Sequence, residues 1–215
     1  MLSWGLVLLV KATCNHGYKN FSGAIMNLGG YVIFLNGLSG AGKTTLSASL
    51  VEQLEQNNQT VTRIDGDVLR GMLSSDLGFS RRDRELNLKR ASYVAGEVVK
   101  HGGTVVCAMI APYQQARDQA KAHVESCGGR FVEVYLSTPL EVCESRDPKG
   151  MYAQARQGVI QGFTGIDSPF EVPSAPDITL NTVDATPAQS LQQLWLELEK
   201  MSSQSNVACI QKVLK

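Results

Sequence analysis

The chain has 215 residues, of which 43% are hydrophobic and 19% are charged, and its 20 Lys and Arg residues balance its 20 Asp and Glu residues. This length fits one α/β domain with a single core, and this composition excludes an intrinsically disordered or collagen-like chain. Because the net charge is zero, no overall field draws the protein toward nucleic acid or a membrane. We therefore expect a soluble enzyme or binding domain that holds any anionic ligand with local cations.

The cysteines and the first residues bear on the cellular location. Five cysteines are scattered along the chain without CxxC pairs, which argues against a zinc site or a disulfide framework and favours the reducing cytoplasm. The opening run MLSWGLVLLV is too short to span a bilayer, and no basic residues precede it as in a signal peptide. We expect residues 1–28 to be an N-terminal extension, either disordered or the result of a misassigned start with Met26 as the true initiator.

From Tyr31 onward, strand-like runs alternate with helical stretches, a pattern typical of a parallel sheet. Short apolar or β-branched runs predict strands over 31–35, 60–65, 104–110, 131–137 and 178–182. Helical patterns predict helices over 43–56, 67–74, 81–101, 113–126, 139–145 and 187–202, with Ser80 and Thr186 as N-caps. We expect a three-layer α/β fold in which helices cover both faces of a central parallel sheet of about five strands.

Two segments lack this periodicity. Residues 146–176 contain four Gly and four Pro, and we expect an irregular segment over one end of the sheet, because loops of that length are usually functional. The polar stretch after Lys200 is expected to be a frayed end, with residues 203–215 as a C-terminal tail.

The sequence GLSGAGKT at residues 37–44 satisfies the Walker A pattern GxxxxGK(S/T) in full, between a predicted buried strand and a predicted helix start. Its glycines let consecutive backbone N–H groups turn toward a phosphate, and the helix N-terminus adds positive potential. Lys43 is expected to reach the β- and γ-phosphates of ATP, and Thr44 to bind Mg²⁺. The fold is therefore expected to be of the P-loop NTPase type, with a nucleotide-binding loop formed by Gly37, Ser39, Gly40, Ala41, Gly42, Lys43, Thr44 and Thr45.

Two carboxylates, Asp65 and Asp67, follow the second predicted strand, at the edge of the sheet where ligands bind in open α/β folds. One of them can order Mg²⁺ and the other can accept a proton. We take Asp67 as the candidate base and Asp65 as the metal ligand, although nothing in the sequence forbids the exchange of these roles. Asp67 can in addition cap the following helix.

Basic residues crowd the span from residue 70 to residue 90. On a helix that begins at Arg81, residues 84, 87 and 91 fall on one face, so Arg84 and Asn87 point the same way. Arg70 and Arg84 are the better candidates for anion ligands. A solvated helix face accounts for the remaining basic residues, Arg81, Arg82, Lys89 and Arg90.

Several ordered motifs together resemble the adenylylsulfate kinase family, also called APS kinases, across roughly residues 29–200. Besides GLSGAGKT, these are DGDVLR at 65–70, LGFSRRDRELNLKR at 77–90, IAPY at 110–113, RDPKGMY at 146–152 and GFTGIDSPFEVP at 162–173. The resemblance implies one kinase domain over residues 29–202, in which residues 146–176 form a mobile lid.

The resemblance also implies the reaction, a step of sulfate activation in which ATP phosphorylates the 3′-hydroxyl of adenosine 5′-phosphosulfate (APS). The products are 3′-phosphoadenosine 5′-phosphosulfate (PAPS) and ADP, and Mg²⁺ assists. It implies that Phe79 and Phe163 stack on the adenine of APS and that Lys149 lies in the lid. The full implied acceptor site is Asp67, Arg70, Phe79, Arg84, Asn87, Ile110, Ala111, Lys149 and Phe163. A homodimer and a functional partnership with sulfate adenylyltransferase are further possibilities.

Two residues depart from the family pattern. Val68 stands where the family usually has Asn, and Ala111 stands where a serine is common.

Two rival functions share the Walker A loop. Another small-molecule P-loop kinase would not need the motifs at 77–90 and 162–173, and a GTP-binding switch would need NKxD after a later strand, where this chain has STPLEV.

Overall fold

A parallel five-stranded sheet is the centre of this computed structural model, which describes residues 28–213 and their side chains up to residue 203. The strand order is β2-β3-β1-β4-β5, and every neighbouring pair is parallel. The strands are β1 (Tyr31–Asn36), β2 (Val61–Asp65), β3 (Thr104–Ala108), β4 (Arg130–Leu136) and β5 (Ile178–Leu180). Each strand begins and ends within two residues of its predicted bounds, and the parallel sheet is confirmed.

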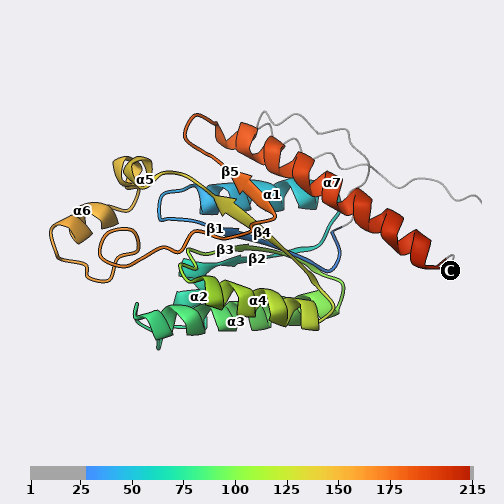
Figure 1. Cartoon of the computed structure of the whole chain (residues 1–215), viewed down its shortest axis with the longest axis horizontal. Helices are drawn as coiled ribbons and strands as arrows, with labels where there is room; N and C mark the ends of the chain where they lie inside the picture. The colour runs from blue at the N-terminus through green and yellow to red at the C-terminus, as the bar shows by residue number, and fades with distance from the viewer. Residues whose placement is uncertain (1–27, 214–215) are drawn as a thin grey trace, which may run out of the picture.

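Helices cover both faces of the sheet, so the three-layer fold is confirmed (Figure 1). One face carries α1 (Lys43–Gln56) and α7 (Pro187–Val213), which pack on each other. The opposite face carries α2 (Gly66–Met72), α3 (Arg81–Lys100) and α4 (Gln114–Ser126). The two short helices α5 (Leu140–Arg146) and α6 (Met151–Arg156) lie beyond the end of the sheet, on the left in Figure 1.

The core has two halves because side chains alternate between the faces of each strand. On β1 every residue is buried, as expected for the central strand of a parallel sheet. Ile33 and Leu35 pack toward the α1 and α7 side, and Val32 and Phe34 pack toward the α3 and α4 side. The result is a rigid platform that fixes the loops at the carboxyl ends of the strands.

Two predicted irregular segments are partly helical. Residues 146–176 contain α6, whose first turn is held by the Asp147 carboxylate, which accepts hydrogen bonds from the N–H groups of Tyr152 and Ala153. This helix has only six residues, too few to give a periodic pattern. Helix α7 runs past Lys200 to Val213, since no Gly or Pro follows Lys200 to end it.

The described residues begin at Leu28, one residue before the predicted domain start. Its side chain is fully buried, and its carbonyl accepts a hydrogen bond of 2.8 Å from the Thr104 hydroxyl. The rest of the predicted extension, with Met26, lies outside the described residues, as does the end of the predicted tail.

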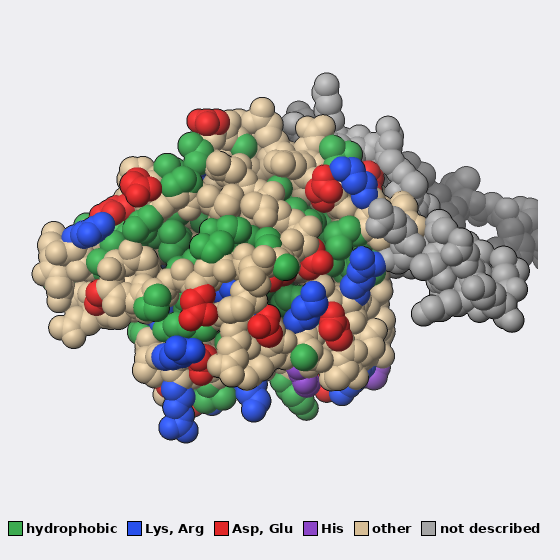
Figure 2. All heavy atoms as spheres, in the orientation of Figure 1, with side chains coloured by type: hydrophobic (Ala, Val, Ile, Leu, Met, Phe, Trp, Pro, Cys, Tyr) green, Lys and Arg blue, Asp and Glu red, His purple; other side chains and the backbone are tan. Residues whose placement is uncertain are grey.

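The surface and the helices bear on possible partners. On the face shown in Figure 2, acidic and basic side chains are interspersed, and no single-sign patch dominates it. Among the described residues, no helix combines the length and apolar character needed to cross a membrane.

Candidate active site

The loop after β1 adopts a backbone that requires glycine. Gly37 has φ 141°, and a Cβ there would lie 2.8 Å from the Leu136 carbonyl oxygen. Gly40 has φ 76°, and a Cβ there would lie 2.9 Å from the Cys143 carbonyl oxygen. The loop ends at Gly42, the N-cap of α1, where no side-chain hydrogen bond caps the described helix. Its first-turn N–H groups are therefore free to serve an anion.

Lys43, the first residue of α1, is buried, and its side chain folds back against this loop. Its ammonium group donates hydrogen bonds of 2.9 Å and 2.7 Å to the carbonyl oxygens of Gly37 and Leu38. Burial lowers the pKa of Lys43 to about 8, because desolvation disfavours the charged form more strongly than the nearby carboxylates favour it. An incoming anion would offset this desolvation.

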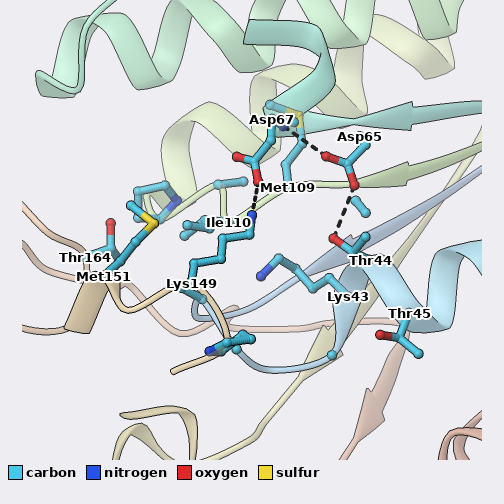
Figure 3. Close-up of a pocket in the computed structure, with 18 of the residues that line it drawn as sticks. Lys43, Thr44, Thr45, Asp65, Asp67, Met109, Ile110, Lys149, Met151 and Thr164 are labelled. Atoms are coloured by element: carbon cyan, nitrogen blue, oxygen red, sulfur yellow. Dashed lines mark hydrogen bonds and ion pairs between the residues drawn. The ribbon is translucent and has the colours of Figure 1, made fainter. Parts of the chain in front are cut away.

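Asp65 connects the loop to the second strand. Its carboxylate accepts hydrogen bonds from the Thr44 hydroxyl at 3.2 Å and from the Asp67 N–H at 3.0 Å (Figure 3). It also forms an ion pair of 3.5 Å with Arg63. Asp65 is therefore the N-cap of α2, and the prediction that Asp67 caps this helix is wrong. The Asp67 side chain is left free of that role.

Lys149 approaches Asp67 from the other side of the cavity. Its ammonium group forms an ion pair with the Asp67 carboxylate, and Figure 3 shows this pair directly above Lys43. Lys149 belongs to the segment that follows α5, so the pair bridges residues 82 positions apart. Three charged groups from three different segments thus meet beside the loop.

These residues line a single cavity of about 1190 Å³. Of the predicted nucleotide-binding loop, Gly37 and Ala41 do not line it, because the first shapes the loop and the second is buried beneath it. The cavity lining includes the other predicted site residues, which are Ser39, Gly40, Gly42, Lys43, Thr44, Thr45, Asp65, Asp67, Arg70, Phe79, Arg84, Asn87, Ile110, Ala111, Lys149 and Phe163.

One wall of the cavity combines arginines with aromatic rings. The Arg70 guanidinium lies 4.7 Å from the centroid of the Phe79 ring, which is 58% exposed. Arg84 donates hydrogen bonds to the carbonyl oxygens of Phe79 at 2.9 Å and of Gly162 at 2.7 Å. It therefore fixes the backbone beside both predicted stacking rings, Phe79 and Phe163. Burial lowers the pKa of both arginines without depriving them of their charge.

Asn87 and Phe163 complete this wall. Asn87 is 3% exposed, and its side-chain oxygen accepts no hydrogen bond from the described residues. Such a buried polar atom has capacity for a ligand. The Phe163 ring packs edge-on against Tyr152, with centroids 4.9 Å apart. The Asp167 carboxylate accepts hydrogen bonds from the backbone N–H groups of Gly162 and Phe163.

The sequence analysis missed residues on the β5 side of the cavity. Arg146 donates hydrogen bonds to the Gly40 carbonyl at 3.3 Å and to the Thr182 carbonyl at 2.6 Å. Arg146 stands at the start of the RDPKGMY motif, which was a usable signal. Thr182 follows β5 without any motif, so only the fold reveals its place. Met109 and Arg63 were missed for the same reason.

The basic residues assigned to a solvated face do not line the cavity. Arg81 pairs with Glu85 at 2.9 Å, and Arg90 pairs with Asp76 at 2.5 Å. Arg82 and Lys89 are exposed. The helical spacing thus separated the arginines that face the cavity from those that do not.

Comparison with known proteins supports a family assignment. Residues 29–181 match the family model of adenylylsulphate kinase. The adenylyl-sulfate kinase of Halothermothrix orenii is 42% identical over 174 residues, which cover 81% of this chain and 92% of that protein. The sulfate adenylyltransferase of Neosartorya fischeri is 42% identical over 171 residues, and this match covers only 30% of that longer protein.

Solved structures agree with this assignment. The APS kinase CysC of Mycobacterium tuberculosis, solved in complex with AMPPNP and APS, is 40% identical with a TM-score of 0.77. The alignment covers 80% of this chain and 98% of that one. A gluconokinase from Sinorhizobium meliloti is 17% identical with a TM-score of 0.51 and shares the fold alone. With its Walker A loop, its arginine and phenylalanine wall and these matches, the chain belongs to the adenylylsulfate kinase family.

Proposed function

We propose that the protein transfers the γ-phosphate of ATP to the 3′-hydroxyl of APS, with release of PAPS and ADP. The observation that carries this proposal is that the phosphate-binding loop and the arginine and phenylalanine wall line the same cavity. The family relationship supports the same activity, and a related APS kinase was solved with AMPPNP and APS. Sulfate activation is therefore the process in which the enzyme acts.

We assign the ATP site to the loop over residues 37–45 and to the β5 side of the cavity. Lys43 would neutralise phosphate charge. The N–H groups at the uncapped start of α1 would donate hydrogen bonds to phosphate oxygens. Arg146 donates hydrogen bonds to the loop carbonyl of Gly40 at 3.3 Å and to the Thr182 hydroxyl at 3.0 Å, and both residues would border the nucleoside. Desolvation inside the cavity strengthens each of these contacts.

Mg²⁺ is the metal that the donor chemistry fits. The Thr44 hydroxyl and the Asp65 carboxylate lie 3.2 Å apart and offer hard oxygen ligands. The described residues include no cluster of three His, Cys, Asp or Glu side chains, which agrees with an ion held largely by substrate phosphates. Bound there, Mg²⁺ would neutralise charge on the transferring phosphate.

We assign APS to the opposite wall of the cavity. The adenine would lie between Phe79 and Phe163, and Arg70 would face the acidic groups of APS. The unused Asn87 side-chain oxygen would accept a hydrogen bond from the nucleotide. Ile110 and Ala111 close the wall at the end of β3.

Asp67 is the proposed base. Its carboxylate is 71% exposed toward the cavity and is not consumed by helix capping, unlike that of Asp65. It would orient the 3′-hydroxyl and accept its proton late, because phosphoryl transfer depends on position and charge neutralisation more than on proton removal. Lys149 pairs with Asp67 before substrate binds and would move to the transferring phosphate afterwards.

The setting of the enzyme is also a proposal. We propose a kinase domain over residues 29–202, in which residues 146–176 act as a lid, because Lys149 and Phe163 reach the cavity from that segment. The longer sulfate adenylyltransferase relatives favour a sulfurylase partner. A hexameric APS kinase of Thiobacillus denitrificans, 33% identical with a TM-score of 0.63, favours self-association, for which we propose a homodimer. The free cysteines of the described chain suit the reducing cytoplasm.

A panel of acceptors tests the substrate assignment. The purified protein is incubated with Mg-ATP and APS, AMP, shikimate or gluconate, and the phosphorylated product is identified by mass. The expected result is rapid ADP release with APS and with none of the other acceptors, together with a product heavier than APS by one phosphoryl group. Equal phosphorylation of AMP, shikimate or gluconate would place the enzyme among other P-loop kinases.

A further inference from the structure

A buried arginine lies behind the acceptor wall and outside the cavity lining. Arg117, on α4, is 1% exposed. It donates hydrogen bonds to the carbonyl oxygens of Ala111 at 2.7 Å and Glu171 at 2.8 Å, and to the Gln114 side chain at 2.7 Å. An arginine with this many buried bonds is held in one geometry.

The charge of Arg117 is balanced from β4. Its Nε lies 3.0 Å from Oε1 of Glu133, an ion-pair contact that is not aligned as a hydrogen bond. The same oxygen accepts a hydrogen bond of 2.6 Å from the side chain of Asn36, the last residue before the phosphate-binding loop. Burial raises the pKa of Glu133, while Arg117 and Asn36 act against this rise. Arg117 thus rests on the rigid sheet.

The first backbone group that Arg117 holds is strained. Ala111 has φ 44°, in the left-handed region that residues other than glycine rarely adopt. Its side chain is buried and lines the acceptor wall. A backbone in that conformation persists only where the surroundings fix it. The hydrogen bond from Arg117 to the Ala111 carbonyl is such a restraint.

The second backbone group belongs to the end of the segment over residues 146–176. The Glu171 N–H donates a hydrogen bond of 2.8 Å to the Pro112 carbonyl, and the Glu171 carboxylate accepts one of 2.7 Å from the Gln114 N–H. Together with the bond from Arg117, these contacts fasten that segment to the loop that carries Ala111. The anchored segment also carries Phe163, another residue of the acceptor wall.

We propose that Arg117 is a positioning residue for the acceptor site, which it serves by holding the strained Ala111 backbone and the Glu171 anchor together on the sheet. It does not touch the substrate. The proposal rests on the assignment of APS to this wall. Arg117 bonds the acceptor wall directly but reaches the phosphate-binding loop only through Glu133 and Asn36. It should therefore affect APS binding far more than ATP binding.

The first test is Arg117→Lys, which keeps a cation but has one nitrogen in place of three. In the wild type, separate guanidinium nitrogens bond the Ala111 carbonyl, bond the Glu171 carbonyl and face Glu133. KM for APS should rise about tenfold, and KM for ATP should stay within about twofold. Arg130→Lys is the matched control. Arg130 donates a hydrogen bond to the Tyr31 hydroxyl at the start of β4, the end of the strand away from the cavity. This control should leave both KM values unchanged. An equal rise of both KM values, or a lower Tm with both unchanged, would reduce Arg117 to a fold-stabilising residue and overturn the proposal.

A second substitution tests the strained backbone itself. Glycine adopts a positive φ without steric cost, so Ala111→Gly in the Arg117→Lys background should recover about threefold in KM for APS. Ala111→Gly alone is also measured, which completes a double-mutant cycle. If the double variant binds APS no better than Arg117→Lys, the held conformation of Ala111 is not the cause, and the proposal fails.

A measurement without substrates separates this proposal from the proposed function. In the ligand-free protein, hydrogen exchange at the Glu171 amide should be about tenfold faster in Arg117→Lys, while amides of β1 keep their wild-type rates. Unchanged exchange at Glu171 would overturn the role of Arg117. If the wild-type protein does not phosphorylate APS at all, the proposed function fails, and this exchange result still decides whether Arg117 holds the anchor.

Discussion

The ammonium group of Lys149 forms an ion pair with the carboxylate of Asp67, and both residues line the cavity. Both side chains are more than half exposed, and ion pairs of this kind contribute little to stability. The pair is therefore easily broken by a substrate. It keeps the proposed base and the proposed lid lysine together while leaving both available for catalysis.

Replacement of the proposed base should separate chemistry from binding. Asp67→Asn should lower kcat by about 10² to 10⁴-fold and change both KM values much less, as expected for a group that acts in the transition state. Steady-state kinetics with each substrate varied measures the effect. Asp76→Asn is the control, because Asp76 pairs with Arg90 outside the cavity. A change in KM alone would move the base to Asp65.

The depressed pKa of Lys43 predicts a dependence of ATP binding on pH. Burial lowers this pKa to about 8 in the ligand-free protein, and bound phosphate should raise it again because an opposite charge favours the ammonium form. ATP binding above pH 8 should therefore take up a proton. Calorimetry at pH 8.5 in two buffers of different ionisation enthalpy measures this uptake, and Lys43→Met should abolish it. Equal heats in the two buffers for the wild type would contradict the depressed pKa.

The same pKa predicts how stability changes with pH. The folded pKa of Lys43 is about 8 and its ordinary value is 10.5, so between these values the unfolded chain binds more protons than the folded one. The contribution of Lys43 to the free energy of unfolding therefore rises with pH across this window and is least favourable below it. Denaturant unfolding of the ligand-free protein from pH 7.5 to 10.5 should show a smaller rise in Lys43→Met than in the wild type. If the free energy of unfolding changes with pH equally in both proteins, the lowered pKa of Lys43 is contradicted.

The sequence predicted the sheet and the phosphate-binding loop because each has a strong local pattern, whereas most of the proposed acceptor wall came from the resemblance to the family. The alternation of strands and helices predicted the parallel order, and helical spacing brought Arg84 and Asn87 to one face. The contacts made by Asp65, Arg146 and Arg117 were not predictable in this way. Arg146 and Arg117 each bond a distant backbone carbonyl, that of Thr182 and that of Glu171, and a carbonyl group carries no residue signature. The cap formed by Asp65 is local, but the sequence offers two carboxylates there and does not show which one accepts the hydrogen bond from the helix N-terminus.

The two proposed stacking rings should respond differently to substitution. Phe79 is 58% exposed, whereas Phe163 is buried against Tyr152. Phe79→Ala should weaken APS binding by about 1 to 3 kcal/mol, by analogy with bases stacked on aromatic side chains, and hardly change Tm. Phe163→Ala should weaken APS binding and also lower Tm. Calorimetric titration with APS and thermal unfolding measure both effects.

Tyr93→Ala is the control for these aromatic substitutions. Tyr93 is 59% exposed, stacks on His123, and does not line the cavity. It should leave the affinity for APS unchanged. An unchanged affinity in Phe79→Ala as well would remove this ring from the acceptor site.

Ala111 predicts the kinetic order of the reaction. It stands where the family often has a serine, and its side chain has no oxygen to carry a phosphate. We therefore expect direct transfer from ATP to the 3′-hydroxyl of APS in a ternary complex, held by the phosphate-binding loop and Asp67. Initial rates with both substrates varied should give intersecting double-reciprocal lines. Incubation with γ-labelled ATP without APS should leave no label on the protein. Parallel lines together with stable label would mean that another side chain in the cavity accepts the phosphate, since Ala111 is chemically unable to do so.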